Sequence, residues 1–88
     1  MDDLMRLIES IKLPMILPDE AFLIMGPKRI PDLGYIMQNF LTPLLDYFDP
    51  NVTAPGAGSG AYLMPLVGGR FLRITVRENQ LVGLEVVG

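Results

Sequence analysis

Apolar residues recur at helical spacing near the start of the chain. Four of them occupy positions i, i+3, i+4 and i+7, which places them on one face of a helix. They are Leu4, Leu7, Ile8 and Ile11. Pro14 ends this helix because proline has no amide hydrogen to donate. Residues 13–18, LPMILP, then lie between two prolines, so we expect them to run extended over the surface of the core.

Residues 18–27, PDEAFLIMGP, allow two interpretations. Pro18 in the first position, acidic residues behind it and the pair Gly26-Pro27 at the end favour a helix of two turns. The alternative is a strand over AFLIM, because periodicity cannot separate a strand from a helix in so short a run. We expect the helix.

The clearest helical pattern lies in residues 31–49. Its apolar stripe comprises Leu33, Ile36, Met37, Phe40, Leu41, Leu44 and Phe48. Pro43 interrupts the hydrogen bonding, but Thr42-Pro43 also matches a cap followed by a proline in the first turn. The stripe stays in phase through Pro43, so we expect a kink or a tight restart there.

After residue 60 the pattern changes to three β-rich runs separated by turn signals. Gly68-Gly69 fits a two-residue hairpin, which would pair Leu66 with Phe71. Pro65 has no N–H to donate, so its strand is expected at a sheet edge.

The length of the second turn can be predicted from the side chains that each loop would place on the same face of the sheet. A two-residue loop at Asn79-Gln80 would set Ile74 opposite Glu85. A three-residue loop, Glu78-Asn79-Gln80, sets Arg73 opposite Glu85 instead and keeps the aliphatic residues on one face. We therefore expect the longer loop, with Asn79 or Gln80 in the left-handed conformation.

These registers divide the meander into two faces. The face expected against the helices carries Ala61, Leu63, Leu72, Ile74, Val76, Val82, Leu84 and Val86. The other face carries Thr75, Leu81, Glu85 and Val87, together with six residues that are aromatic, aliphatic or basic: Tyr62, Met64, Leu66, Phe71, Arg73 and Arg77. A face that meets only water should be polar, whereas a mixture of aromatic, Met and Arg side chains is typical of an interface core. We predict a protein interface formed by these six residues; the alternative is that the N-terminal segment folds over them.

The composition is consistent with an apolar surface that binds a partner. Half of the 88 residues are hydrophobic and 19% are charged, which is apolar for a small domain with much surface to cover. We expect one α+β domain over residues 1–88: two or three N-terminal helices packed on a three-stranded antiparallel meander. The helical part is 1–50, the Gly-rich loop is 51–60 and the meander is 61–88.

Several classes of function are disfavoured. The net charge of −3 disfavours nucleic acid as a partner. No signal sequence and no apolar run long enough to span a membrane is found, so a cytoplasmic protein is expected. GAGSG at residues 56–60 lacks the strand before it and the helix after it that a phosphate-binding loop requires.

The chain has no histidine and no cysteine, so catalysis and metal binding lack their usual side chains, and we expect no enzyme and no cofactor. The predicted function is a small protein–protein interaction or assembly module, acting by self-association as a homo-oligomer or as an adaptor. The alternative is a small-molecule or anion-binding regulatory domain in which Arg73 and Arg77 clamp an anion.

Overall fold

The computed structural model of the chain describes residues 3–52 and 60–88. The helical elements are α1 (Asp3–Ser10), the 3-10 turn η1 (Asp19–Ala21), α2 (Leu33–Phe40) and the 3-10 segment η2 (Thr42–Tyr47). The strands are β1 (Met15–Ile16), β2 (Phe22–Met25), β3 (Lys28–Pro31), β4 (Ala61–Leu66), β5 (Arg70–Arg77) and β6 (Gln80–Val87). Of the glycine-rich stretch 56–60, only Gly60 lies within the described residues.

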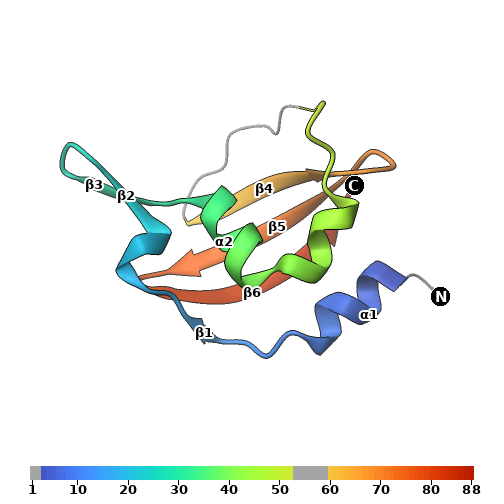
Figure 1. Ribbon diagram of the computed structural model, residues 1–88, viewed down its shortest axis with the longest axis horizontal. Helices are drawn as coiled ribbons and strands as arrows, with labels where there is room; N and C mark the ends of the chain where they lie inside the picture. The colour runs from blue at the N-terminus through green and yellow to red at the C-terminus, as the bar shows by residue number, and fades with distance from the viewer. Residues whose placement is uncertain (1–2, 53–59) are drawn as a thin grey trace.

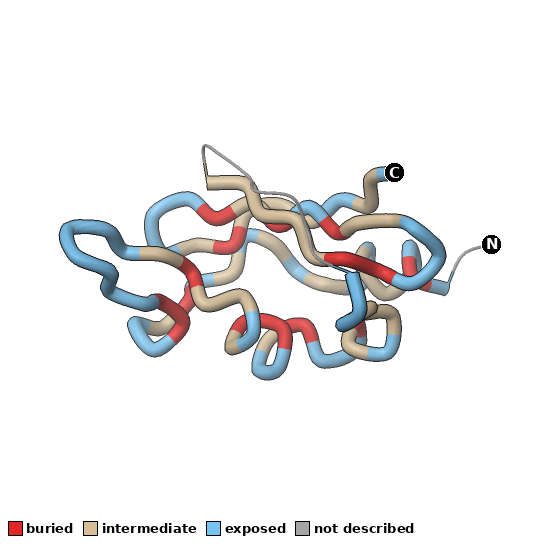
Figure 2. The backbone as a smooth tube through the Cα atoms, turned by 90° about the horizontal axis from the view of Figure 1, so that it is seen from above, coloured by how far each residue is buried: buried red, intermediate tan, exposed pale blue. Residues whose placement is uncertain are grey.

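The fold has two layers (Figure 1). One layer is an antiparallel sheet with the strand order β1-β6-β5-β4. The other layer is formed by the helical segments, which lie on one side of this sheet, as the view turned by 90° shows (Figure 2). The α+β class predicted from the sequence is confirmed, but the sheet has four strands rather than three, and β2 and β3 form a separate two-stranded sheet.

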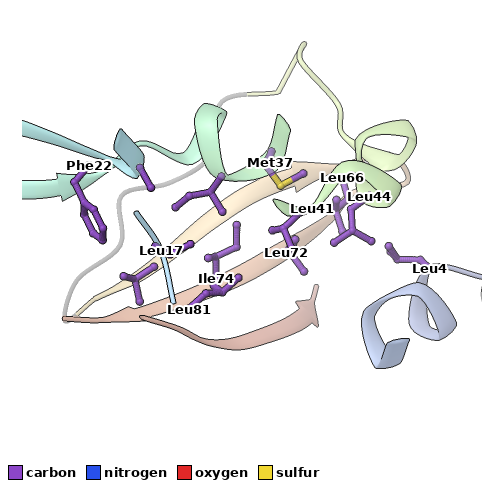
Figure 3. Close-up of a cluster of buried hydrophobic side chains, with 13 residues drawn as sticks. Leu4, Leu17, Phe22, Met37, Leu41, Leu44, Leu66, Leu72, Ile74 and Leu81 are labelled. Carbon is purple, nitrogen blue, oxygen red and sulfur yellow. The ribbon is translucent and has the colours of Figure 1, made fainter. Parts of the chain in front are cut away.

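The hydrophobic core lies between the two layers. Figure 3 shows side chains from the helical layer, among them Leu41 and Leu44, facing Leu72, Ile74 and Leu81 of the sheet. All five are fully buried. The described residues bury no polar or charged residue in this core, so it is stabilised by apolar burial and close packing.

The segment between the first two prolines is extended, as predicted, but it does not merely cover the core. Met15 and Ile16 pair with Leu81 and Gln80 of β6, so the segment adds a strand to the edge of the sheet. Leu17 follows into the core, and its N–H donates to the carbonyl of Asn79. The segment therefore does not fold over the outer face, the face away from the helices.

The helix expected at residues 18–27 is wrong. Only η1 is helical there; β2 and β3 form an antiparallel hairpin in which Met25 pairs with Lys28 and Phe22 with Pro31. Gly26 has a φ of +64° and is followed by Pro27, which suits a two-residue turn with positive φ at its first position. Gly-Pro therefore reverses a strand here, and the acidic residues before AFLIM belong to η1.

Residues 31–49 follow the prediction closely. Asp32 caps α2 by accepting a hydrogen bond from the N–H of Tyr35 at 3.2 Å. The helix ends at Phe40 and restarts as η2 at Thr42, with Pro43 in its first turn. The expected restart is confirmed, and most of the apolar stripe is buried or packed against the core.

The predicted register of the first hairpin is wrong by one residue. Leu66 pairs with Arg70 rather than with Phe71, so the loop comprises Val67, Gly68 and Gly69. Proline explains the longer loop. A two-residue loop would place Pro65 at a position that must donate an N–H to β5, whereas the observed loop turns its backbone outward, where its carbonyl accepts from Asp49. The edge position of β4 is confirmed.

The second hairpin is correct along most of its length. Arg73 lies opposite Glu85 and Ile74 opposite Leu84, as predicted. Nearer the turn, Val76 pairs with Leu81, and the register shifts between Thr75 and Val76. The expected loop is therefore wrong.

The turn is Glu78-Asn79, and the positive φ, at 57°, belongs to Glu78 rather than to Asn79 or Gln80 as predicted. Val82 is the extra residue of a β-bulge in β6. The turn is therefore one residue shorter than predicted, and Gln80 belongs to β6 rather than to the loop. Leu81 takes the core position predicted for Val82.

Candidate functional site

The six predicted interface residues do not share one face. The corrected register sets Met64 opposite Leu72 and Leu66 opposite Arg70, so β4 turns its even-numbered side chains towards the helices. Leu66 is fully buried and Met64 packs against the core. Tyr62, Met64 and Leu66 therefore line the helix side, while Phe71, Arg73 and Arg77 lie on the outer face. The shift follows from the loop length, because a slip of one residue exchanges the faces.

The outer face is a set of short rows across β4, β5 and β6. An apolar row is Pro65, Phe71 and Val87, and the next row is Leu63, Arg73 and Glu85. No described helix covers this face (Figure 2). Its apolar residues are half-buried by their neighbours or, in the case of Pro65, buried. The interface predicted on this face stays a prediction. Of the predicted interface residues that are not arginine, only Phe71 lies on this face.

The two arginines are not brought together. Arg73 forms an ion pair with Glu85 across the strand pair. Arg77 lies four residues further along the same strand, about 13 Å away at the usual rise per residue. This pairing and this spacing give no support to a shared clamp on one anion.

The most exposed apolar surface lies elsewhere, on the β2–β3 hairpin, which we call the arm (residues 22–31). The arm projects from the body beyond the end of the large sheet (Figure 1). Leu23, Ile24 and Met25 are 49%, 71% and 59% exposed, and they follow one another directly. Because successive side chains of a strand point to opposite faces, Leu23 and Met25 lie on one face of the arm and Ile24 on the other, so both faces expose apolar side chains. Exposed apolar surface of this kind marks a candidate binding site.

The base of the arm is held firmly by polar and aromatic contacts. Phe22 is buried, and the guanidinium of Arg29 lies 3.7 Å from the centre of its ring. The same guanidinium donates to the carboxylate of Asp19 in η1 at 3.1 Å. The N–H of Asp32 donates to the carbonyl of Ala21 at 2.7 Å and closes the base. These contacts join the base of the arm to η1 and to the start of α2; the ion pair is exposed and contributes little, so the buried ring of Phe22 and the backbone bond contribute most.

The outer edge of β2 is open. In an antiparallel pair, successive residues turn their backbone groups alternately towards and away from the partner strand. Ala21 faces β3, as its bond from Asp32 shows, and the N–H of Phe22 points away, because it donates to Asp19. By this alternation the N–H and C=O of Ile24 also point away from β3. No other strand of the described residues pairs with β2 there.

The sequence did carry a signal for the arm. AFLIM is a five-residue apolar run without polar alternation, and the residues after Gly26-Pro27 are long enough to pair back on it. The pattern allows the strand but does not predict its exposure, because a continuous apolar run usually indicates a buried strand.

No helix of the described part of the chain is long and apolar enough to cross a membrane. Among residues 3–52 and 60–88, no group of three or more acidic side chains lies close enough together to hold a metal ion. No family model, curated protein or solved structure matches the chain.

Proposed function

We propose that the protein acts by binding another protein chain, as an assembly or interaction module, and that the arm makes the contact. The exposure of Leu23, Ile24 and Met25 carries the proposal. Burying three such side chains removes unfavourable contact with water, at about 1.5–3 kcal/mol for each fully buried side chain. A protein partner with an apolar surface or an open strand edge supplies that burial.

The shape of the arm supports the proposal. A two-stranded hairpin is only marginally stable in water by itself, yet this one projects from the body with its base secured by Arg29. Open strand edges invite another strand to pair with them. Natural proteins protect such edges with charges or proline, and β2 carries neither.

A matched pair of variants tests the role of the arm. Ile24→Glu places a charge at the most exposed apolar residue of the arm, which is 71% exposed. Val67→Glu makes the same kind of change in the β4–β5 loop, at the opposite end of the molecule (Figure 1). Val67 is 44% exposed, and because both side chains are exposed neither variant should unfold the protein. Ile24→Glu should weaken binding of the partner, whereas Val67→Glu should not.

Photo-cross-linking probes the same two positions for contact with a partner. It is carried out in cells that produce the chain, with a photoreactive amino acid in place of Ile24 or of Val67. We expect a protein adduct of defined mass from position 24 that is absent from position 67. The two cross-linking variants should have the same circular dichroism spectrum, which shows that both are folded. Adducts of equal yield from the two positions, or from neither, would contradict a docking role for the arm.

A further inference from the structure

We infer that the partner of the arm is a second copy of this chain, with β2 of one copy paired antiparallel to β2 of the other around a two-fold axis at Ile24. This inference rests on the proposed function and names its partner. The two arms would then form one four-stranded sheet in the order β3-β2-β2-β3.

The backbone of β2 fits such a pair. The N–H and C=O of Ile24 face the open edge, so two copies centred there exchange two hydrogen bonds between the same residue in each chain. Leu23 of one copy then lies opposite Met25 of the other, and the two Ile24 side chains face each other. Every cross-strand pair is apolar, and such pairs stabilise a sheet.

Charge selects β2 over β3 as the contact edge. β2 consists of Phe22–Met25 and carries no charge. β3 begins with Lys28 and Arg29, so pairing two β3 strands would bring four cations together. Like charges on opposed strands destabilise the pair. A symmetric contact is therefore favoured on the β2 side.

The charges at the two ends of the arm complement each other in the antiparallel arrangement. The tip carries Lys28, and the base carries Asp19 and Glu20 of η1. Centring on Ile24 sets Gly26 beside Phe22 of the second copy, so each tip reaches the other copy's base. Lys28 lies on β3, with β2 between it and the second copy, so it attracts the acidic residues at that copy's base without direct contact. This attraction occurs twice in the dimer.

The same pattern disfavours a lipid surface as the occupant. An apolar tip with a basic residue can enter an anionic membrane, but the base would bring Asp19 and Glu20 towards the same headgroups. The whole chain also carries a net charge of −3. An acidic base is complementary to another basic tip and not to an anionic membrane.

Sedimentation equilibrium of the purified chain at low ionic strength tests the inference. Wild type and Val67→Glu are expected to dimerise with equal affinity. Ile24→Glu should weaken dimerisation about tenfold or more, because two carboxylates would face each other at the axis. Lys28→Glu and Glu20→Lys should each weaken it about two- to threefold, since an attraction between exposed charges that occurs twice in the dimer becomes a repulsion. The double variant Lys28→Glu/Glu20→Lys should restore the affinity.

Other outcomes overturn the inference in distinguishable ways. A dimer that is unaffected by Ile24→Glu forms through another surface, and the inference is wrong. A chain that stays monomeric, but still cross-links from position 24 to a different protein, refutes the second copy and leaves the proposed function standing. A monomer that binds vesicles of anionic phospholipid through Ile24, with no protein adduct, overturns both.

Discussion

The corrected register of the first hairpin predicts a clear contrast between two leucines on one strand. Leu66 is 1% exposed and faces the core, whereas Leu63 is half-buried on the outer face. In the register expected from the sequence their positions would be exchanged. Leu66→Ala and Leu63→Ala are therefore a matched pair that reports which side chain fills the core.

The expected magnitude follows from burial. Truncating a fully buried leucine to alanine costs about 2–5 kcal/mol, because apolar contacts are lost and a cavity remains. Leu66→Ala should fall in that range, and Leu63→Ala should cost about 1 kcal/mol or less, since part of its surface already meets water. For a domain of this size, about 1 kcal/mol changes the Tm by roughly 4–8 °C.

Urea denaturation followed by circular dichroism measures the difference. With an unchanged m-value, the shift in midpoint gives the loss of free energy of unfolding directly. Failure of Leu66→Ala to fold, with Leu63→Ala folded, agrees with the structure. Equal losses, or a larger loss for Leu63→Ala, would refute the three-residue loop and the assignment of faces that depends on it.

Three further changes test particular contacts by urea denaturation, and the third is also measured by amide exchange. Asp32→Ala removes the cap of α2 and should cost about 0.5–2 kcal/mol, whereas Asp46→Ala should be close to neutral; equal effects would argue against the cap. Gly60→Ala should destabilise more than Gly68→Ala: both have positive φ, but a Cβ at Gly60 would lie 2.7 Å from a backbone oxygen of β5, and at Gly68 it meets nothing within 4 Å. Arg29→Ala should cost about 0.5–1 kcal/mol and speed amide exchange in the arm, because it removes the contact with Phe22; unchanged exchange would show that the base does not depend on it.

The sequence predicted the parts of the fold that are set by long, consistent patterns. The stripe from Leu33 to Leu44 runs over three turns, so a single misread residue could not alter it. The pairing of Arg73 with Glu85 was predictable because a slip of one residue would set the carboxylate of Glu85 opposite Ile74, among aliphatic residues.

The structure differs from the expectation in short segments and at Pro65. The missing N–H of Pro65 predicts an edge strand, but it also sets the length of the loop after that strand, and the loop length decides which side chains lie on each face. The bulge at Val82 exchanges one inward residue for another without changing the hydrophobic pattern, so periodicity could not predict it.

The excess of apolar residues predicts that some apolar surface is left for a partner, and this stays a prediction. The place of such a surface in the fold could not be predicted from the sequence. Its position on the arm depends on whether Leu23, Ile24 and Met25 are covered, and only the three-dimensional arrangement shows that they are not.

Residue-resolved amide hydrogen exchange at Ile24 tests the central claim most directly. In the single chain this N–H faces the open edge of β2, whereas the N–H of Leu23 faces β3 and serves as the internal control. From micromolar to millimolar concentration, protection at Ile24 should rise as dimers form, while protection at Leu23 changes little. Rapid exchange at Ile24 that stays the same at every concentration would contradict the pairing of two arms.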